Sequence, residues 1–328
     1  MDCGNRISNI SDGARYLSLM QQVLEIVTQV RKVVVGKDAV IGSILMAMLA
    51  QGHVLLEDVP GVGKTTMALA FSRAMDLSYK RMQFTPDVMP SDITGYTTLL
   101  IGGGTGAYVP GAAMCNLFLA DEINRASSKT QSALLEVMEE NSITVDGVTH
   151  AVPQPFLVIA TQNPAGSSGT QPLPESQLDR FMVRLSMGYP DRRSEVEMLR
   201  RHQNAVSLDS VNRVVSPQDL ALMQREVENI FVSEALFAYI TDLASWTRAQ
   251  PSIRFGVSPR GTIALLRMSK ASAYLSGRDY LIPQDVQGVF ENVCAHRLLL
   301  SPRAMVSGLT EQQLAKRALT QVPSPVVV

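Results

Sequence analysis

The stretch EDVPGVGKTT at residues 57–66 constrains the fold more than any other part of the sequence. It fits the phosphate-loop pattern G-x-x-x-x-G-K-[ST], except that Asp58 stands where the pattern has its first glycine. The apolar run HVLLE precedes the loop and a helical pattern follows it, which is the strand–loop–helix context that the pattern requires. Because Asp tolerates left-handed backbone better than most residues, the turn can survive the exchange.

The residue types of the loop suit a polyphosphate. Backbone N–H groups around Gly61 and Gly63 would cradle the phosphates, and glycine allows their close approach. Lys64 would reach the β and γ oxygens, and the Thr65 hydroxyl would ligate Mg²⁺. Asp58 has to point away from bound phosphates, because charge repulsion is costly in a site of low dielectric constant. The predicted nucleotide-binding residues of the loop are Pro60, Gly61, Val62, Gly63, Lys64, Thr65 and Thr66.

A second motif, LFLADEINRA, ends an apolar strand in two carboxylates. Asp121 would hold hydrated Mg²⁺, and by itself it would fit a kinase as well as a hydrolase. Glu122 favours hydrolysis, because it can polarise the water that attacks the γ-phosphate. A further apolar strand ends at Asn163, whose amide could orient that water or contact the γ-phosphate. An ordinary turn before Pro164 is the alternative for Asn163.

Two arginines follow at predicted element boundaries. Arg180 lies where a short helix meets the last strand, and it could act in trans on the γ-phosphate of a neighbouring subunit. A local ion pair with Asp179 or another nearby acid is the alternative. In SPRG, Ser258 is the predicted N-cap of a helix and Arg260 lies in the first turn, where a cation opposes the helix dipole. Arg260 is therefore a candidate phosphate sensor, the alternative being an exposed charge.

Apolar runs and helical patterns alternate over the first part of the chain, which predicts a three-layer α/β fold with a parallel sheet. Two stretches interrupt the alternation: residues 94–112 are rich in turn residues, and ITVDGVTH is a hairpin pattern around Asp146-Gly147. Only helical patterns follow residue 190. The predicted strands lie in 53–58, 79–84, 115–122, 155–163 and 180–187. The expected parts are a flexible end (1–13), an α/β core (14–189) with inserts at about 92–112 and 143–150, and a helical domain (190–328).

Composition and charge disfavour several classes of function. The 328 residues carry a net charge of −1, and neither insert contains Lys or Arg, which disfavours stable nucleic-acid binding. The longest apolar run, residues 39–50, is too short for the roughly 20 residues of a membrane span. Three widely spaced cysteines without a C-x-x-C pair suggest reduced thiols, and the N-terminus shows no apolar signal core. We therefore expect a cytoplasmic protein.

Taken in order, these segments resemble the AAA+ ATPases, and specifically the MoxR family, over about residues 15–325. The runs that carry the resemblance are GHVLLEDVPGVGKT, QFTPDVMPSDITGY, LFLADEINRA, PFLVIATQNP, LPESQLDRFM and SPRGTIALLR. The resemblance implies ATP or ADP with Mg²⁺ as cofactors and a P-loop parallel-sheet core with a C-terminal all-helical lid. It implies Walker A roles for Lys64 and Thr65, Walker B roles for Asp121 and Glu122, sensor 1 for Asn163, an arginine finger for Arg180, sensor 2 for Arg260, and adenine contacts for Val34, Val35 and Gly36.

The two inserts resemble the helix-2 insert and the pre-sensor-1 hairpin of the clade that holds magnesium chelatase and the minichromosome-maintenance helicases. In that clade the lid is repositioned, so Arg260 could serve the nucleotide of an adjacent subunit. The resemblance further implies a hexameric ring with inserts facing a pore. It also implies a chaperone role in assembling or activating protein complexes, including metal-cofactor insertion, often with von Willebrand factor A-domain partners. Asp58 and Ser127-Ser128 depart mildly from the family pattern.

The expected function is an ATP-hydrolysing machine that remodels a protein client. A DNA-translocating motor shares the clade but would need basic inserts. A small-molecule kinase would need an acceptor pocket and no water-activating Glu122. A nucleotide-switched scaffold with slow hydrolysis also fits the motifs, and the sequence identifies no client.

Overall fold

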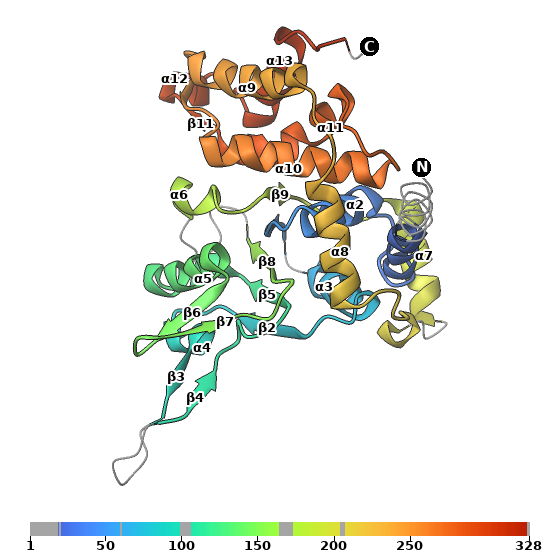
Figure 1. Ribbon diagram of the computed structural model, residues 1–328, viewed down its shortest axis with the longest axis vertical. Coiled ribbons are helices and arrows are strands. Elements are labelled where there is room, and N and C mark those ends of the chain that lie inside the picture. Colours follow the sequence, from blue (N-terminus) through green and yellow to red (C-terminus); the bar gives the residue numbers. More distant parts are fainter. Residues whose placement is uncertain are drawn as a thin grey trace, which may run out of the picture.

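A five-stranded parallel sheet forms the centre of the computed structural model (Figure 1). The described residues are 19, 21–59, 61–98, 106–163, 173–203 and 207–326. The strand order is β2-β5-β8-β1-β9. The strands are β1 (Val54–Glu57), β2 (Tyr79–Gln83), β5 (Leu117–Asp121), β8 (Leu157–Gln162) and β9 (Val183–Leu185). Each strand lies within one of the five predicted ranges, so the predicted parallel sheet is confirmed.

The central strands β1, β5 and β8 are buried on both faces, so the sheet lies between two apolar layers. Along β5, Leu117 and Leu119 pack into one hydrophobic cluster, whereas Phe118 and Ala120 pack into the other. Helices α2 and α3 contribute to the first cluster and α5 to the second. The predicted three-layer arrangement is therefore confirmed, and the carboxyl ends of the parallel strands meet at one edge of the sheet.

The helices of the first part of the chain flank this sheet (Figure 1). A first helix covers residues 21–31. The others are α2 (Asp38–Leu49), α3 (Lys64–Ala74), α4 (Pro90–Thr94), α5 (Ser128–Glu140), α6 (Glu175–Leu178), α7 (Arg192–Gln203) and α8 (Pro217–Glu228), with the short 3-10 turns η1 (Ile123–Arg125) and η2 (Leu208–Ser210). Among the described residues, no helix is long and apolar enough to cross a membrane.

Both predicted inserts form small antiparallel sheets. Strand β6 (Ser142–Val145) pairs with β7 (Val148–Ala151) around Asp146-Gly147, both with positive φ, so the predicted hairpin is confirmed. In the other insert, β3 (Gly95–Thr97) pairs with β4 (Tyr108–Pro110), and residues 99–105 between them lie outside the described residues. The Tyr108 and His150 rings stack with centroids 3.8 Å apart, which joins the two inserts.

The last part of the chain forms a helical lid, which lies at the end of the molecule opposite β3 and β4 (Figure 1). Its elements are α9 (Glu234–Ala249), β10 (Ile253–Phe255), α10 (Pro259–Leu275), α11 (Pro283–Cys294), η3 (Ala295–Arg297), β11 (Leu299–Leu300), α12 (Pro302–Val306) and α13 (Glu311–Gln321). The antiparallel pair of β10 and β11 corrects the expectation of helices only after residue 190. Strands of two or three residues show no periodicity by which a sequence can reveal them.

His53 joins the start of β1 to two neighbouring elements. Its Nδ1 accepts a 3.0 Å hydrogen bond from the Val158 N–H in β8, and its Nε2 lies 3.0 Å from the Met138 carbonyl oxygen. Because Nδ1 is an acceptor, the ring is neutral and Nε2 is the donor. Burial lowers the pKa of His53 from 6.5 to about 4.

We expect His53 to make folding stability fall by about 3 kcal/mol between about pH 7 and pH 4. The unfolded chain takes up a proton below pH 6.5, whereas the folded chain does so only near pH 4. The contribution is therefore complete above pH 6.5 and is lost as the pH falls through this window. Urea unfolding of the wild type, His53→Gln and the exposed control His202→Gln measures it. Between pH 7 and pH 4, His53→Gln should lose less free energy of unfolding than the wild type and His202→Gln. An equal loss in all three proteins would contradict the role given to His53.

Candidate nucleotide-binding site

The phosphate loop connects β1 to α3 through two glycines in left-handed backbone. Gly61 has φ +86° and Gly63, the N-cap of α3, has φ +95°. A side chain would strain both positions, which explains why glycine occupies them. The free N–H groups of the first turn of α3 begin at Lys64 and give this end of the helix its affinity for anions. Pro60 lies outside the described residues.

Lys64 places a buried cation in the loop. Only 8% of the residue is exposed, and its ammonium donates one 2.9 Å hydrogen bond to the Asp58 carbonyl oxygen. Burial lowers the pKa of Lys64, although the carboxylates of Asp58, Asp121 and Glu122 act in the opposite direction. Within the described residues Lys64 forms no ion pair within 4.0 Å, so N–H capacity remains for an anionic ligand.

Asp121 at the end of β5 is held in place by two partners. Its Oδ1 accepts a 2.6 Å hydrogen bond from the Thr161 hydroxyl in β8, and its Oδ2 lies 2.7 Å from the guanidinium of Arg81 in β2. The Thr161 hydroxyl oxygen in turn accepts the backbone N–H of Glu122 at 2.8 Å. Three neighbouring strands thus fix the orientation of this carboxylate at the edge of the sheet.

Glu122 and Asn163 are in contact. The Asn163 amide donates to Glu122 Oε1 at 3.2 Å, and Arg125 pairs with Glu122 Oε2 at 2.9 Å. The Asn163 Oδ1 atom is buried and has no hydrogen-bond partner among the described residues. Glu122 itself adopts left-handed backbone with φ +57°, a conformation that costs free energy for a residue with a side chain.

One pocket contains seven of the residues that the sequence selected. It is lined by Gly61, Gly63, Lys64, Thr65, Arg81, Gln83, Asp121, Glu122 and Asn163. These groups fit a nucleoside triphosphate with Mg²⁺: a cation and backbone N–H groups face carboxylate and hydroxyl oxygens, which are the ligands that Mg²⁺ prefers. The orphaned Asn163 Oδ1 can accept a hydrogen bond from a water in this pocket.

Four of the other predicted binding residues, Val35, Gly36, Val62 and Thr66, do not line this pocket. Val62 packs partly against the hydrophobic core, and Thr66 lies in the first turn of α3. Val35 and Gly36 form the turn before α2. A Cβ atom at Gly36 would lie 2.1 Å from the Ser194 hydroxyl oxygen, so only glycine fits against α7 there.

Arg180 and Arg260 lie together, apart from the phosphate loop of their own chain. Both pair with Glu139 of α5, the Arg180 pair measuring 2.5 Å. Both line a second pocket that shares no residue with the first. Within the single chain Arg180 therefore forms a local ion pair, which was the alternative to a role in trans. Its partner is Glu139 rather than Asp179. Arg260 is exposed over 47% of its side chain, in agreement with the alternative of an exposed charge, and it is paired with Glu139.

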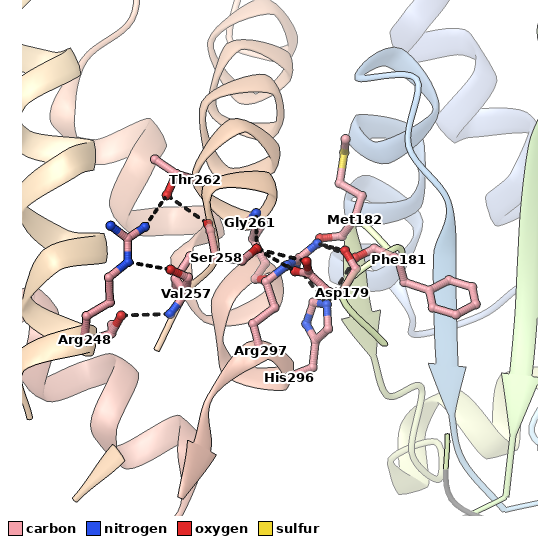
Figure 2. A network of polar contacts seen from close by, with 12 residues as sticks. Asp179, Phe181, Met182, Arg248, Val257, Ser258, Gly261, Thr262, His296 and Arg297 are labelled. Atoms are coloured by element: carbon pink, nitrogen blue, oxygen red, sulfur yellow. Dashed lines mark hydrogen bonds and ion pairs between the residues drawn. The ribbon is translucent and has the colours of Figure 1, made fainter. Parts of the chain in front are cut away.

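The lid holds the segment that carries Arg180 (Figure 2). Ser258 caps α10, accepting the Gly261 N–H at 3.0 Å as predicted, and its hydroxyl donates to the Asp179 carboxylate. The Arg297 side chain is 2% exposed and pairs with Asp179 at 2.8 Å. It also donates to the Phe181 carbonyl oxygen at 2.6 Å. Contacts at Asp179 and Phe181, the neighbours of Arg180 on either side, thus hold this backbone against the lid.

Sequence reasoning missed Arg81, Thr161 and Arg297. Arg81 acts on Asp121 because β2 is the neighbour of β5, with Gln83 in register with Asp121. Thr161 reaches the same carboxylate because β8 is the other neighbour. Both assignments require the strand order, which the sequence pattern does not contain. A polar residue at the end of each apolar strand was the available signal.

Comparison with known proteins agrees with this architecture. Residues 53–183 match the model of the ATPase family associated with various cellular activities (AAA), and residues 246–318 match the AAA lid domain. A crystal structure from Cytophaga hutchinsonii, described as an ATPase, superposes with a TM-score of 0.90 at 35% identity, covering 98% of this chain and 100% of that chain. The helical lid and the parallel-sheet core are thus both shared with that protein.

Two curated relatives match over nearly the full length. Chaperone MoxR1 of Mycobacterium tuberculosis is 38% identical over 96% of this chain and 86% of its own. The protein YeaC of Bacillus subtilis is 45% identical over 92% of this chain and 94% of its own. Identity at this level, across core and lid together, shows common descent, and the chain belongs to the MoxR family of AAA+ ATPases.

Proposed function

We propose that this protein binds ATP with Mg²⁺ and hydrolyses it to drive the remodelling of a protein client. The observation that supports hydrolysis most strongly is the pocket that joins Lys64, Asp121, Glu122 and Asn163. A kinase would need a pocket for a phosphate acceptor, whereas a hydrolase needs a carboxylate that activates water, a role that Glu122 can fill. The AAA family match and the MoxR relatives support ATPase activity as a family property.

Each residue of the pocket has a proposed task. The loop N–H groups and Lys64 bind the phosphates, while Thr65 and Asp121 hold Mg²⁺, which would neutralise charge developing on the phosphates. Glu122 accepts a proton from the attacking water, and Asn163 orients that water. Asn163 and Arg125 each donate to one Glu122 oxygen, which orients the carboxylate and leaves lone pairs for the attacking water.

Assembly would complete the site. Arg180 and Arg260 line a separate pocket next to the lid, so we propose that they contact the nucleotide of an adjacent subunit in a ring, hexameric as in the family. The two inserts, joined by Tyr108 and His150, would face the client or a von Willebrand factor A-domain partner. The relative named as a chaperone supports a client-directed role. Metal-cofactor insertion is one such role, and we place the protein in the cytoplasm without stable nucleic-acid binding.

A substrate-trap experiment tests the client-directed role. Glu122→Gln held in ATP should retain the client, because the ring would stop before hydrolysis. Proteins captured by this variant are compared by mass spectrometry with those captured by Lys64→Ala, which should not bind ATP. Enrichment of one protein, an A-domain protein above all, is the expected result. An empty trap with ATP demonstrably bound would contradict remodelling and favour the nucleotide-switched scaffold.

A further inference from the structure

The carboxylate of Asp58 binds a turn far along the chain. Only 5% of Asp58 is exposed, and it accepts three hydrogen bonds. These come from the Ser186 hydroxyl at 2.9 Å, the Met187 N–H at 2.5 Å and the Gly188 N–H at 3.0 Å. The side chain therefore points away from the phosphates, as the sequence predicted. We call residues 186–189, which lead from β9 towards α7, the connector turn.

Lys37 holds the connector turn from its carbonyl side. Its ammonium donates to the carbonyl oxygens of Met187, Gly188 and Tyr189, at 3.0 Å for Gly188 and 2.9 Å for Tyr189. Lys37 follows Gly36, whose backbone packs directly on Ser194 of α7. The connector turn thus has its N–H groups bound to the phosphate loop and its carbonyl groups bound to the segment before α2.

The backbone of Asp58 is linked to the phosphate-binding cation. Lys64 donates to the Asp58 carbonyl oxygen at 2.9 Å, so the ammonium that would bind an anion in the loop also holds the main chain of Asp58. The same residue therefore contacts Lys64 through its main chain and the connector turn through its side chain. A glycine at this position, as in the general loop pattern, would leave the buried Met187 N–H without its acceptor.

We propose that Asp58 is a positioning residue that couples occupancy of the phosphate loop to the connector turn and, through it, to α7. The inference rests on the proposed nucleotide binding. Three hydrogen bonds to one buried carboxylate tie the loop to the turn, and α7 begins three residues after the turn. By thermodynamic reciprocity, anything that displaces the connector turn changes nucleotide affinity as well.

Hydrogen exchange with and without ADP and Mg²⁺ tests this coupling. In the wild type, nucleotide should slow amide exchange by about tenfold both in loop residues 61–66 and at Met187 and Gly188. In Asp58→Asn an amide N–H₂ faces these N–H donors. The nucleotide-dependent slowing should then persist in the loop but disappear at the connector turn. Because nucleotide-free and nucleotide-bound states of one variant are compared, a general loss of stability does not produce this pattern.

Two further variants keep the test decisive. Ser186→Ala removes one of the three donors and leaves both backbone donors, so it should show reduced slowing at the connector turn even if Asp58→Asn does not fold. Asp76→Asn is the matched control, since its carboxylate pairs with Arg213 on the surface, and it should behave as wild type. Wild-type slowing at the connector turn in Asp58→Asn, or in Ser186→Ala if that variant alone folds, overturns the proposal. Absence of slowing in the wild-type loop overturns the proposed nucleotide binding instead.

Discussion

Glu122→Gln should bind ATP with wild-type affinity and hydrolyse it about 10² to 10⁴ times more slowly. An amide has the size of the carboxylate: its oxygen can accept from Arg125, and its N–H₂ group can donate to the unpartnered Asn163 Oδ1 once that amide turns over, so the pocket keeps its shape. It cannot accept a proton from water, however, and the attacking water stays weakly nucleophilic. Phosphate release under single-turnover conditions measures the loss, and fluorescence of a bound mant-nucleotide measures the affinity.

The matched control for this change is Glu140→Gln, an exposed glutamate at the end of α5. It alters the net charge by the same amount and should leave turnover unchanged. Undiminished turnover in Glu122→Gln would exclude Glu122 as the base. A joint loss of turnover and of ATP affinity would instead mean that Glu122 supports the pocket structurally.

Arg180→Ala should retain ATP binding and lose about 10³ to 10⁵ in turnover, the range known for arginine fingers. In the single chain Arg180 pairs with Glu139 and lines a pocket apart from the phosphate loop. Its catalytic partner would therefore be the nucleotide of another subunit. Mixing Arg180→Ala with Lys64→Ala should restore part of the activity, because a mixed interface combines an intact loop with an intact arginine.

Two controls accompany the mixing experiment. Native mass spectrometry has to show mixed assemblies, and Arg317→Ala, which removes an exposed arginine of α13, should keep full turnover. Mixed assemblies without recovered activity would contradict action in trans.

The fold of the core could be predicted because the sequence patterns that indicate it are local. The runs that became β5 and β8 are apolar at successive positions, as strands buried on both faces require, and the phosphate loop stands directly after one such strand. The orientation of Asp58 followed from electrostatics alone, since a carboxylate facing phosphates would be unstable. Its partners at residues 186–188 could not be predicted, because they depend on β9 lying beside β1.

The packing of the lid on the core could not be predicted from the sequence. The ion pair of Arg260 with Glu139 needs the start of α10 to lie near the end of α5, and no periodicity encodes that packing. The buried Arg297 lies in a short 3-10 turn whose sequence resembles an exposed helix end. Arg81 likewise gains its contact with Asp121 only through strand order.

We propose above all that the pocket around Lys64 and Glu122 hydrolyses ATP. The most direct measurement is continuous phosphate release from ATP and Mg²⁺ by the purified full chain, beside Lys64→Ala prepared in the same way. We predict repeated turnover by the wild type and none by Lys64→Ala. Phosphate release at the Lys64→Ala level by a wild type that binds ATP would contradict the claim, and would leave a nucleotide switch in place of an ATPase.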